Sequence, residues 1–539
     1  MKKILKNKFD FLILALVVLS FFIYSFSSFF VWLPNWHDFG HLIFNWPDAN
    51  ANYFFVNLFA KNNSLSFFEP LNLLTDNLLH TRSINVWQGN LVPMTFLLPL
   101  IIFGIFAKVF GSLAVLFLTP LLASISLYFF YQIIAKVFAS ENLAFVATVL
   151  LAFFAPWLFF ANVVMLTNVF FIFCLLAFLY FFLVQQTKYS FVLSFLFFAL
   201  ALFSRPNELI WLFIFLLFIY FYQKEKITLK KISIFFAINL FFLVLVLVLN
   251  KLVYGGVFNF GYLNLQNKAL SGELGNSHFS LFSFIKLLFL PFAWQTKVFL
   301  SSIYHYLFLL IWPYYILIFF ALFSLRKKLF QKKEIWSKYL IFSLTISLLL
   351  LIYYANWDFA DALVKNYNTI SISYVRYFLP IYLLLLPFVA QGILFLSRVK
   401  KWKNFLTIFL VLLLTIFSLR LAFFAPNDGL LKNKENIDLY YQQFAKVKQI
   451  IPADAVIITE RSDKIFFPEF KVVVPQGDLP LWPRIASLME EREVFYFSDL
   501  SEQRILELNF QAKLFGLELV EMSKIDQNFK LFIVIKTKE

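Results

Sequence analysis

Long apolar stretches, separated by short polar segments, recur over the first 424 residues and set the strongest limit on the fold. Residues 11–33 and 232–252 are two of them, and each exceeds the roughly 20 apolar residues that a helix needs to cross a bilayer. Of the 539 residues, 61% are hydrophobic and 14% are charged, whereas about a quarter of a soluble domain is charged. The sequence therefore predicts an α-helical polytopic membrane protein.

The candidate spans carry almost no charge in their interiors. They are residues 11–33, 91–110, 112–138, 142–160, 163–184, 189–204, 207–223, 232–254, 299–325, 339–356, 374–396 and 403–424. Residues 1–30 resemble a secretion signal, but the apolar part is too long and no small-x-small cleavage site precedes Trp32. We therefore expect this first helix to be retained.

Lysine and arginine cluster in short segments between the spans, and such segments face the cytoplasm by the positive-inside rule. The clusters are residues 1–8, 223–231, 326–334 and 397–403. This pattern predicts a multi-pass protein of the plasma (inner) membrane, with a cytoplasmic N-terminus and with residues 34–90, 254–297, 356–373 and the tail after 425 outside. The same clusters account for the net charge of +16, so no nucleic-acid partner is expected.

The orientation imposes a condition on the number of crossings. An odd number must join the outer loop 34–90 to the inner segment 223–231, yet the candidate segments between them are even in number. One of them must be re-entrant or too short, which leaves about 11 transmembrane helices. Residues 91–138 are the first suspects, because proline and glycine interrupt them.

The tail after residue 425 has the pattern of a small α/β domain. Helical patterns cover residues 436–450, 484–491 and 501–515, with Ser501 as a predicted N-cap, and strand patterns cover 455–459, 471–474, 493–498 and 531–536. The predicted division of the chain is a first transmembrane helix (1–33), a first external loop with interfacial helices (34–90), a multi-helix transmembrane domain (91–424) and an extracytoplasmic α/β domain (425–539).

The first external loop holds most of the candidate chemistry. It carries the acidic residues Asp38, Asp48, Glu69 and Asp76, together with Arg82. A loop of this length between spans is usually functional or disordered, and its many aromatic residues favour interfacial helices. Carboxylates held at the membrane surface can act on a lipid head group.

Three motifs in this loop, "WPDANANYFF", "LSFFEPLN" and "HTRSINVWQGNLVP", resemble the first external loop of the C-type (GT-C) glycosyltransferases. That superfamily includes protein O-mannosyltransferases and the transferases that add aminoarabinose to lipid A. The resemblance implies a polyprenyl-phosphate sugar donor and an essential aspartate just after the first transmembrane helix. With the helix count and the soluble tail, it covers nearly the whole chain.

Asp48 matches the essential aspartate of that superfamily, and Tyr53 matches the aromatic residue a few positions later. Ala49 departs from the common Asp-Glu pair, which argues against a two-carboxylate or metal-binding version of the motif. Asp38 is the competing catalytic candidate, and Tyr53, Glu69 and His80 are the candidates for substrate binding, with His80 the weaker one. A purely structural alternative is that Asp48 caps a helix over residues 49–61.

A phosphate leaving group requires positive charge at the outer membrane face. Arg82, Arg205 and Arg376 are predicted there, and guanidinium groups bind phosphate through paired donors. The resemblance supports Arg376 and Tyr377, because "RY" followed by proline recurs at that helix start in related transferases. The alternatives are snorkelling, or ion pairs with Glu208 or Asp361.

Other features carry weaker signals. His37 and His41 are spaced to share a helix face, which permits a metal site, but no His-Glu-x-x-His motif occurs. Asp358 and Asp361 lie in an outer loop. Residues 459–470 of the tail are compact and polar, without an assigned role. No Walker A or Rossmann glycine pattern follows a strand, and Cys174 is the one cysteine, so no cofactor is expected.

The leading hypothesis is a glycosyltransferase that moves a sugar from a polyprenyl-phosphate donor to an unknown glycan, lipid or protein acceptor outside the cytoplasm. Asp48 acts as general base in this hypothesis, and membrane lipid surrounds the helices. Two alternatives stay open. One is a lipid-linked glycan flippase or transporter, which would need charges near the membrane midplane. The other is a polysaccharide polymerase or ligase.

Overall fold

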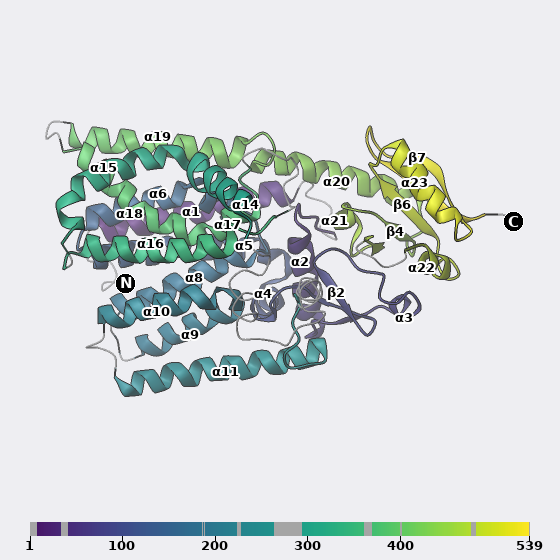
Figure 1. The fold of residues 1–539 in the computed structure, drawn as a ribbon, viewed down its shortest axis with the longest axis horizontal. Coiled ribbons are helices and arrows are strands. Elements are labelled where there is room, and N and C mark those ends of the chain that lie inside the picture. Colours follow the sequence, from purple (N-terminus) through teal and green to yellow (C-terminus); the bar gives the residue numbers. More distant parts are fainter. Residues whose placement is uncertain are drawn as a thin grey trace. The chain divides into compact units, whose positions relative to one another are not determined.

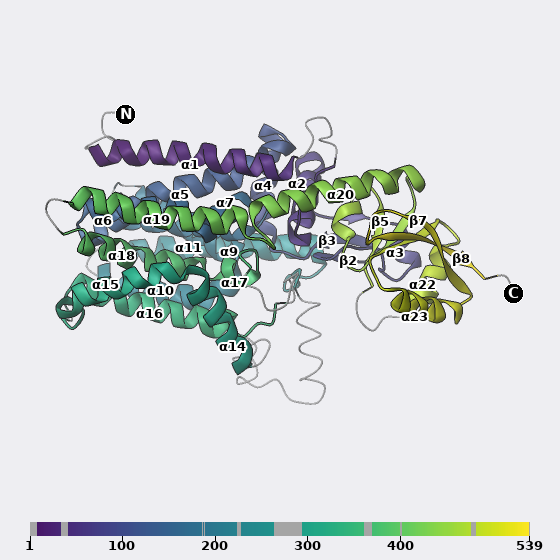
Figure 2. The ribbon, with the colours of Figure 1, turned by 90° about the horizontal axis from the view of Figure 1, so that it is seen from above.

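A computed structural model describes residues 8–33, 41–185, 187, 189–223, 228–262, 294–331, 333–359, 369–398, 402–475 and 481–537 (Figures 1 and 2). The chain divides into two compact units, each made of segments far apart in sequence. The helical unit comprises Met1–Ser28, Leu116–Val246 and Leu263–Lys432, and the mixed unit comprises Phe29–Val115, Leu247–Tyr262 and Asn433–Glu539.

Apolar helices make up the helical unit. They are α1 (Lys8–Trp32), α5 (Val115–Phe138), α6 (Glu141–Phe153), α7 (Ala155–Asn162), α8 (Thr167–Leu179), η2 (Tyr180–Val184), α9 (Ser190–Ser204), η3 (Pro206–Glu208), α10 (Leu209–Gln223), α11 (Leu229–Tyr254), α14 (Thr296–Ser302), η5 (Ile303–Phe308), η6 (Leu309–Ile311), α15 (Trp312–Leu329), α16 (Ile335–Tyr354), α17 (Ser373–Tyr377), α18 (Leu379–Leu396) and α19 (Lys403–Phe424); α1 and α11 extend into the mixed unit. The predicted class, a polytopic helical membrane protein, is confirmed.

Among the described residues, 8 helices are long and apolar enough to cross a membrane, or up to 10 if each of two bent pairs is one span. The expected number was about 11. The suspected segment within 91–138, already left out of that number, is α4 (Leu97–Phe110), which has 14 residues. At about 1.5 Å per residue it is about 21 Å long, shorter than a hydrocarbon core of about 30 Å. The stretch 91–110 is therefore not a span.

The lower number comes from the pair α9 and α10, which counts as one span at most and which the chain joins through a bend of 106° at Arg205 and η3. Such a bend belongs either to a broken span or to a re-entrant loop. If the pair α9–α10 is re-entrant and the pair α6–α7, bent by 52°, is one span, the crossings left between loop 34–90 and segment 223–231 are α5, α6–α7 and α8. This is the odd number that the orientation requires, while the orientation itself stays a prediction.

In the mixed unit, the first external loop and the residues that follow it form helices and a small sheet. The helices are α2 (Pro47–Asn62), α3 (Leu71–Leu74), α4 and η1 (Ser112–Ala114), and the antiparallel sheet has the order β1 (Phe67–Phe68), β3 (Asn90–Pro93), β2 (Ile84–Trp87). Helix α4 packs on α2, and Gly104 of α4 faces the ring of Phe59 of α2. A Cβ added at Gly104 would lie 2.6 Å from Cδ1 of that ring. The sequence predicted helices here but not the sheet.

The tail forms a five-stranded sheet with the order β5-β4-β6-β8-β7. Its strands are β4 (Val456–Ile458), β5 (Lys471–Val473), β6 (Val494–Ser498), β7 (Leu517–Lys524) and β8 (Lys530–Lys536), and its helices are α20 (Leu430–Ile450), α21 (Asp463–Phe466), α22 (Leu481–Leu488) and α23 (Glu502–Lys513). Strand β4 is parallel to β5 and β6, whereas β8 is antiparallel to β6 and β7.

These elements confirm the strand and helix predictions for the tail, apart from β7, which the sequence analysis missed. The predicted cap is also confirmed, because the Ser501 hydroxyl accepts a hydrogen bond from the backbone N–H of Arg504 at 3.4 Å.

The hydrophobic core of the tail includes residues of the first external loop. Leu71, Leu78 and Leu79 pack in one cluster with tail residues such as Val473 and Trp482. Leu79 also forms an isolated antiparallel bridge with Val473. The loop and the tail therefore share one core, although the sequence suggests two separate domains.

Within the helical unit, α15 and α18 lie side by side (Figures 1 and 2), and Gly392 permits their closest approach. A Cβ at Gly392 would lie 2.0 Å from the backbone oxygen of Leu317, which cannot move aside as a side chain can. We expect Gly392→Ala to destabilise the protein by about 1–3 kcal/mol through overpacking. Thermal unfolding in detergent measures this effect.

Gly104→Ala is the matched control, because its added Cβ meets the movable ring of Phe59. Its unfolding temperature should fall less than that of Gly392→Ala. Equal stability of Gly392→Ala and the unmodified protein would contradict the close packing of α15 and α18.

Candidate active site

Asp48 lies in the first turn of α2, and Trp46 occupies the N-cap position. The expected helix over 49–61 begins earlier, at Pro47, so Asp48 is not the capping residue. The Asn50 side chain closes this turn, since it accepts from Phe44 N at 3.1 Å and donates to Phe44 O at 2.8 Å. Because it is in the first turn, Asp48 lies at the positive end of the helix dipole.

The half-buried Asp48 carboxylate accepts a hydrogen bond from the hydroxyl of Ser83. Ser83 comes from the segment before β2, 35 residues further along the same loop. Its backbone has a φ of 64°, in the left-handed region where a residue other than glycine is uncommon. Surrounding contacts must hold this backbone in place.

Arg82, the neighbour of Ser83, is held by Asp463 of the tail. The Asp463 carboxylate accepts from Arg82 N and Arg82 Nε, each at 2.9 Å, and also from Arg82 Nη2. Only 1% of the Asp463 side chain is exposed, against 27% for Arg82. The guanidinium predicted to bind the donor phosphate is thus bound to a buried carboxylate of the same unit.

The other predicted substrate-binding residues of the loop lie around α2 and β5. Tyr53 follows Asp48 on α2, and burial raises the pKa of its hydroxyl. Buried Glu69 forms an ion pair with Lys471, the first residue of β5. Burial lowers the pKa of His80, so its imidazole is neutral near pH 7.

Asp38, His37 and Asp361 lie outside the described residues. His41 is buried, with its Nε2 3.0 Å from the backbone oxygen of Ile465. Asp358 is exposed. Across the part of the chain that the structure describes, no group of three or more His, Cys, Asp or Glu side chains is placed to hold a metal ion.

In the helical unit, Arg205 sits at the bend between α9 and α10 and forms a buried ion pair with Glu208 at 2.8 Å. This is the alternative partner that the sequence allowed. The Tyr354 hydroxyl at the end of α16 accepts from Arg205 Nη2 at 3.0 Å and donates to Glu208 Oε1 at 2.6 Å. The Trp211 indole donates to the other Glu208 oxygen.

Tyr377 and Arg376 of α17 lie next to this cluster. The Tyr377 ring stacks on Tyr354 at 4.3 Å with an interplanar angle of 4°. Both guanidinium groups lie near the same ring, Arg205 at 4.9 Å and Arg376 at 5.2 Å from its centroid. Arg376 also donates to Ser373 Oγ at 2.8 Å. Three separate segments thus bring two cations and two phenols together.

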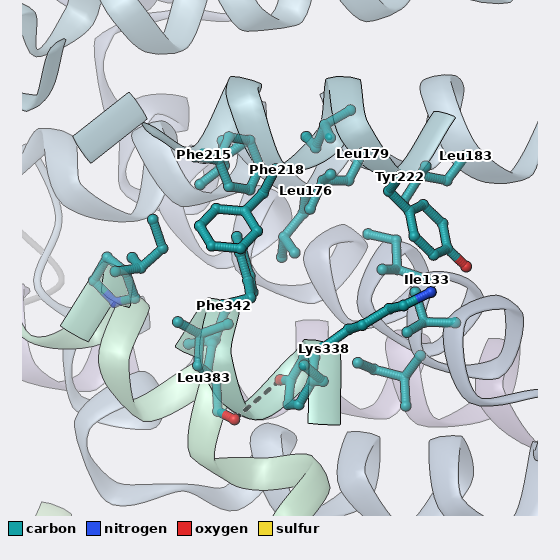
Figure 3. A pocket seen from close by; sticks show the side chains of 18 of the residues that line it. Ile133, Leu176, Leu179, Leu183, Phe215, Phe218, Tyr222, Lys338, Phe342 and Leu383 are labelled. Atoms are coloured by element: carbon teal, nitrogen blue, oxygen red, sulfur yellow. Dashed lines mark hydrogen bonds between the residues drawn. The ribbon is translucent and has the colours of Figure 1, made fainter. Parts of the chain in front are cut away.

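Figure 3 shows an apolar cavity, whose volume is about 430 Å³. It adjoins this cluster, because Trp211 lines it and also donates to Glu208. Its walls come from α5, α8, α10, α16 and α18 and are almost entirely aliphatic and aromatic. Figure 3 shows the amine of Lys338 and the hydroxyl of Tyr222 directed toward the same end of the cavity. The cavity has the chemistry of a site for a hydrocarbon chain.

The residues expected to converge belong to different units. Asp48 and Arg82 are in the mixed unit, whereas Arg205, Arg376 and Tyr377 are in the helical unit. The structure brings together Asp48 with Ser83, and Arg205 with Arg376 and Tyr377. The approach of Asp48 to the arginines of the helical unit stays a prediction.

No protein-family model matches the sequence, and no curated protein matches it. Among solved structures, the chain is similar to the archaeal oligosaccharyltransferase AglB from Archaeoglobus fulgidus, solved in complex with an inhibitory peptide and a dolichol-phosphate. The match covers 97% of this chain and 74% of that chain, with 10% sequence identity and a TM-score of 0.47. A similarity at this level gives no evidence about the function of this chain.

Sequence reasoning missed Ser83, Tyr354, Trp211 and Asp463. Ser83 and Asp463 stand within motifs that the analysis singled out, but a serine or aspartate in a polar loop gives no signal of its partner. Tyr354 and Trp211 sit near helix ends, where aromatic residues are common at membrane interfaces. Their roles emerge only from contacts between helices far apart in sequence.

The Arg205–Glu208 pair yields a stability prediction. Glu208→Gln leaves a buried guanidinium without its anion, and loss of one partner of a buried pair costs about 3–5 kcal/mol. We expect a clear fall in unfolding temperature in detergent. Glu141→Gln, at an exposed position of α6, is the matched control and should change little. Equal unfolding temperatures for both variants would contradict the buried pair.

Proposed function

We propose that the protein is a membrane glycosyltransferase that moves a sugar from a polyprenyl-phosphate donor to an acceptor outside the cytoplasm. The observation that carries the proposal is Asp48, a half-buried carboxylate at a helix N-terminus, fixed by Ser83 inside the loop that resembles GT-C transferases. Such a carboxylate is suited to receive a proton from an acceptor hydroxyl.

The bond changes define the roles of the residues. The acceptor oxygen attacks the anomeric carbon, its proton passes to the Asp48 carboxylate, and the bond from that carbon to the phosphate oxygen breaks. The leaving group is the polyprenyl phosphate, which keeps the bonding electrons. Positive charge from Arg376 stabilises this phosphate, and Arg205 holds the adjoining Tyr377 and Tyr354 in place.

The apolar cavity supports the lipid part of the proposal. Its aliphatic and aromatic walls suit an isoprenoid chain, and Trp211 links the cavity to the Arg205–Glu208 cluster. A lipid that places its tail in the cavity would have its phosphate near the cluster of arginines and tyrosines. The sugar and the acceptor are not specified by these residues.

Replacement of the proposed base tests the reaction. Asp48→Asn keeps the size of the side chain and removes its basicity, so transfer should fall by about 10²–10⁴-fold. The measurement is transfer of labelled sugar from an extracted polyprenyl-phosphate sugar by purified, folded protein. Asp76→Asn, at an exposed position of the same loop, is the control and should keep full activity. Full transfer by Asp48→Asn would reject the role of Asp48.

Replacement of Arg376 tests the donor site. A hydrogen bond to a charged group contributes about 1.5–3 kcal/mol, so Arg376→Gln should raise the KM for the donor by about 10–100-fold. Donor titration at saturating acceptor measures this. Arg326→Gln, in the last turn of α15, should leave the donor KM unchanged. An unchanged KM for Arg376→Gln would place the phosphate elsewhere.

A flippase for lipid-linked glycans is the second candidate, and one observation favours it. Transporters often bind substrates at broken helices, and the buried Arg205–Glu208 pair sits at the 106° bend between α9 and α10. A flippase would move a fluorescent polyprenyl-phosphate sugar across liposomes without releasing its sugar. Asp48→Asn would not be expected to impair that movement.

A further inference from the structure

The short helix α21 of the tail contacts the first external loop through three consecutive residues. Asp463 binds Arg82, Lys464 Nζ donates to the backbone oxygen of Asn45 at 2.9 Å, and the backbone oxygen of Ile465 lies 3.0 Å from His41 Nε2. These residues belong to the polar segment 459–470, to which the sequence assigned no role. All of them lie in the mixed unit.

The contacts of α21 reach both sides of Asp48. On one side, Asn45 immediately precedes the N-cap of α2, whose first turn contains Asp48. On the other side, Arg82 is bonded directly to Ser83, whose hydroxyl donates to Asp48. Phe467, just after α21, also packs edge-on against Phe54 of α2 at 4.8 Å.

Asp463 is placed to hold the backbone that carries Ser83. One of its oxygens accepts from the Arg82 backbone N–H at 2.9 Å, and the other accepts from the Arg82 guanidinium. Asp463 thereby fixes both the main chain and the side chain of the residue before Ser83. A left-handed serine backbone persists when surrounding contacts determine it in this way.

We infer that α21 positions the proposed catalytic base, with Asp463 acting on Asp48 through Arg82 and Ser83. The inference rests on the proposed function and gives the tail a part in it. Asp463 is a positioning residue, since it lies two residues removed from the carboxylate that receives the proton. A base displaced by about 1 Å can cost about 10²-fold in rate, so such a contact affects turnover without touching substrate.

The main alternative is that the Arg82–Asp463 pair only attaches the loop to the tail. The Arg484–Asp76 ion pair offers a matched comparison, because it also joins the tail to this loop. Asp76→Asn breaks that pair by the same chemical change as Asp463→Asn. A simple attachment role predicts a clear loss of stability for Asp463→Asn, little loss for Asp76→Asn because 76% of the Asp76 side chain is exposed, and unchanged turnover in both folded variants.

Ser83→Gly separates positioning from stability. Glycine accepts a φ of 64° at no steric cost, so this variant removes the hydroxyl and keeps the backbone conformation. The experiment measures kcat, the KM of donor and acceptor, and the unfolding temperature of full-length protein for Asp463→Asn, Ser83→Gly, their double variant and Asp76→Asn.

We expect kcat to fall by about 10–100-fold in Asp463→Asn and Ser83→Gly, with both KM values within about twofold of the unmodified protein. The unfolding temperature of Ser83→Gly should not fall, and Asp76→Asn should keep its kcat. Because Asp463 acts through Ser83, the double variant should be no slower than Ser83→Gly alone.

Two outcomes separate this inference from the proposed function. If Asp48→Asn abolishes transfer while Ser83→Gly keeps full kcat, the positioning role is overturned and the proposed function stands; this holds even where Asp463→Asn does not fold. If Asp48→Asn retains transfer, the base role fails and the positioning role fails with it.

Discussion

A bilayer offers no water to the backbone, so each N–H and C=O within it must be bonded inside the protein. Helices meet this requirement in their interiors, and polar chemistry is therefore confined to the ends and breaks of helices. The candidate residues follow this constraint. Arg205 lies at the bend between α9 and α10, Tyr354 ends α16, and Arg376 belongs to the short α17 before α18.

In the mixed unit, the proposed catalytic residue also lies at the end of a helix, but segments from elsewhere in the chain hold that helix end in place. Asp48 occupies the first turn of α2, where the helix dipole stabilises an anion. The support for this turn comes from the same loop, through Ser83, and from the tail, through α21. The tail is thus joined to the loop by a shared core and by buried polar contacts, rather than by the chain alone.

Periodicity and charge were sufficient to predict the helical class, the tail's α/β pattern and the Ser501 cap, because these depend on local sequence. Strand β7 escaped prediction because charged residues interrupt its apolar positions, and its place in the sheet depends on pairing with β8. Proline and glycine marked residues 91–138 as the first suspects for a segment that does not span, and the helix Leu97–Phe110 is too short to cross a membrane.

In the candidate site, too, the sequence indicated individual residues but not their distant partners. A motif pointed to Asp48, and an arginine among apolar residues pointed to Arg205 and Arg376. The partners were invisible in the sequence, because Asp463 is 381 positions from Arg82 and Tyr354 is 149 positions from Arg205. Arg82 and Arg205 were predicted to bind the donor phosphate, but each guanidinium already neutralises a buried carboxylate. Their ion pairs therefore favour a structural role.

The proposed function requires that Asp48 receive the acceptor proton and that Arg376 stabilise the phosphate of the same lipid-linked sugar. The most direct measurement is an experimental structure of the protein with a non-hydrolysable polyprenyl-phosphate sugar and an acceptor analogue. The account predicts the phosphate against Arg376, the tail in the cavity lined by Trp211, and the acceptor hydroxyl about 2.6–3.2 Å from the Asp48 carboxylate. A bound lipid whose sugar lies far from Asp48 would contradict it.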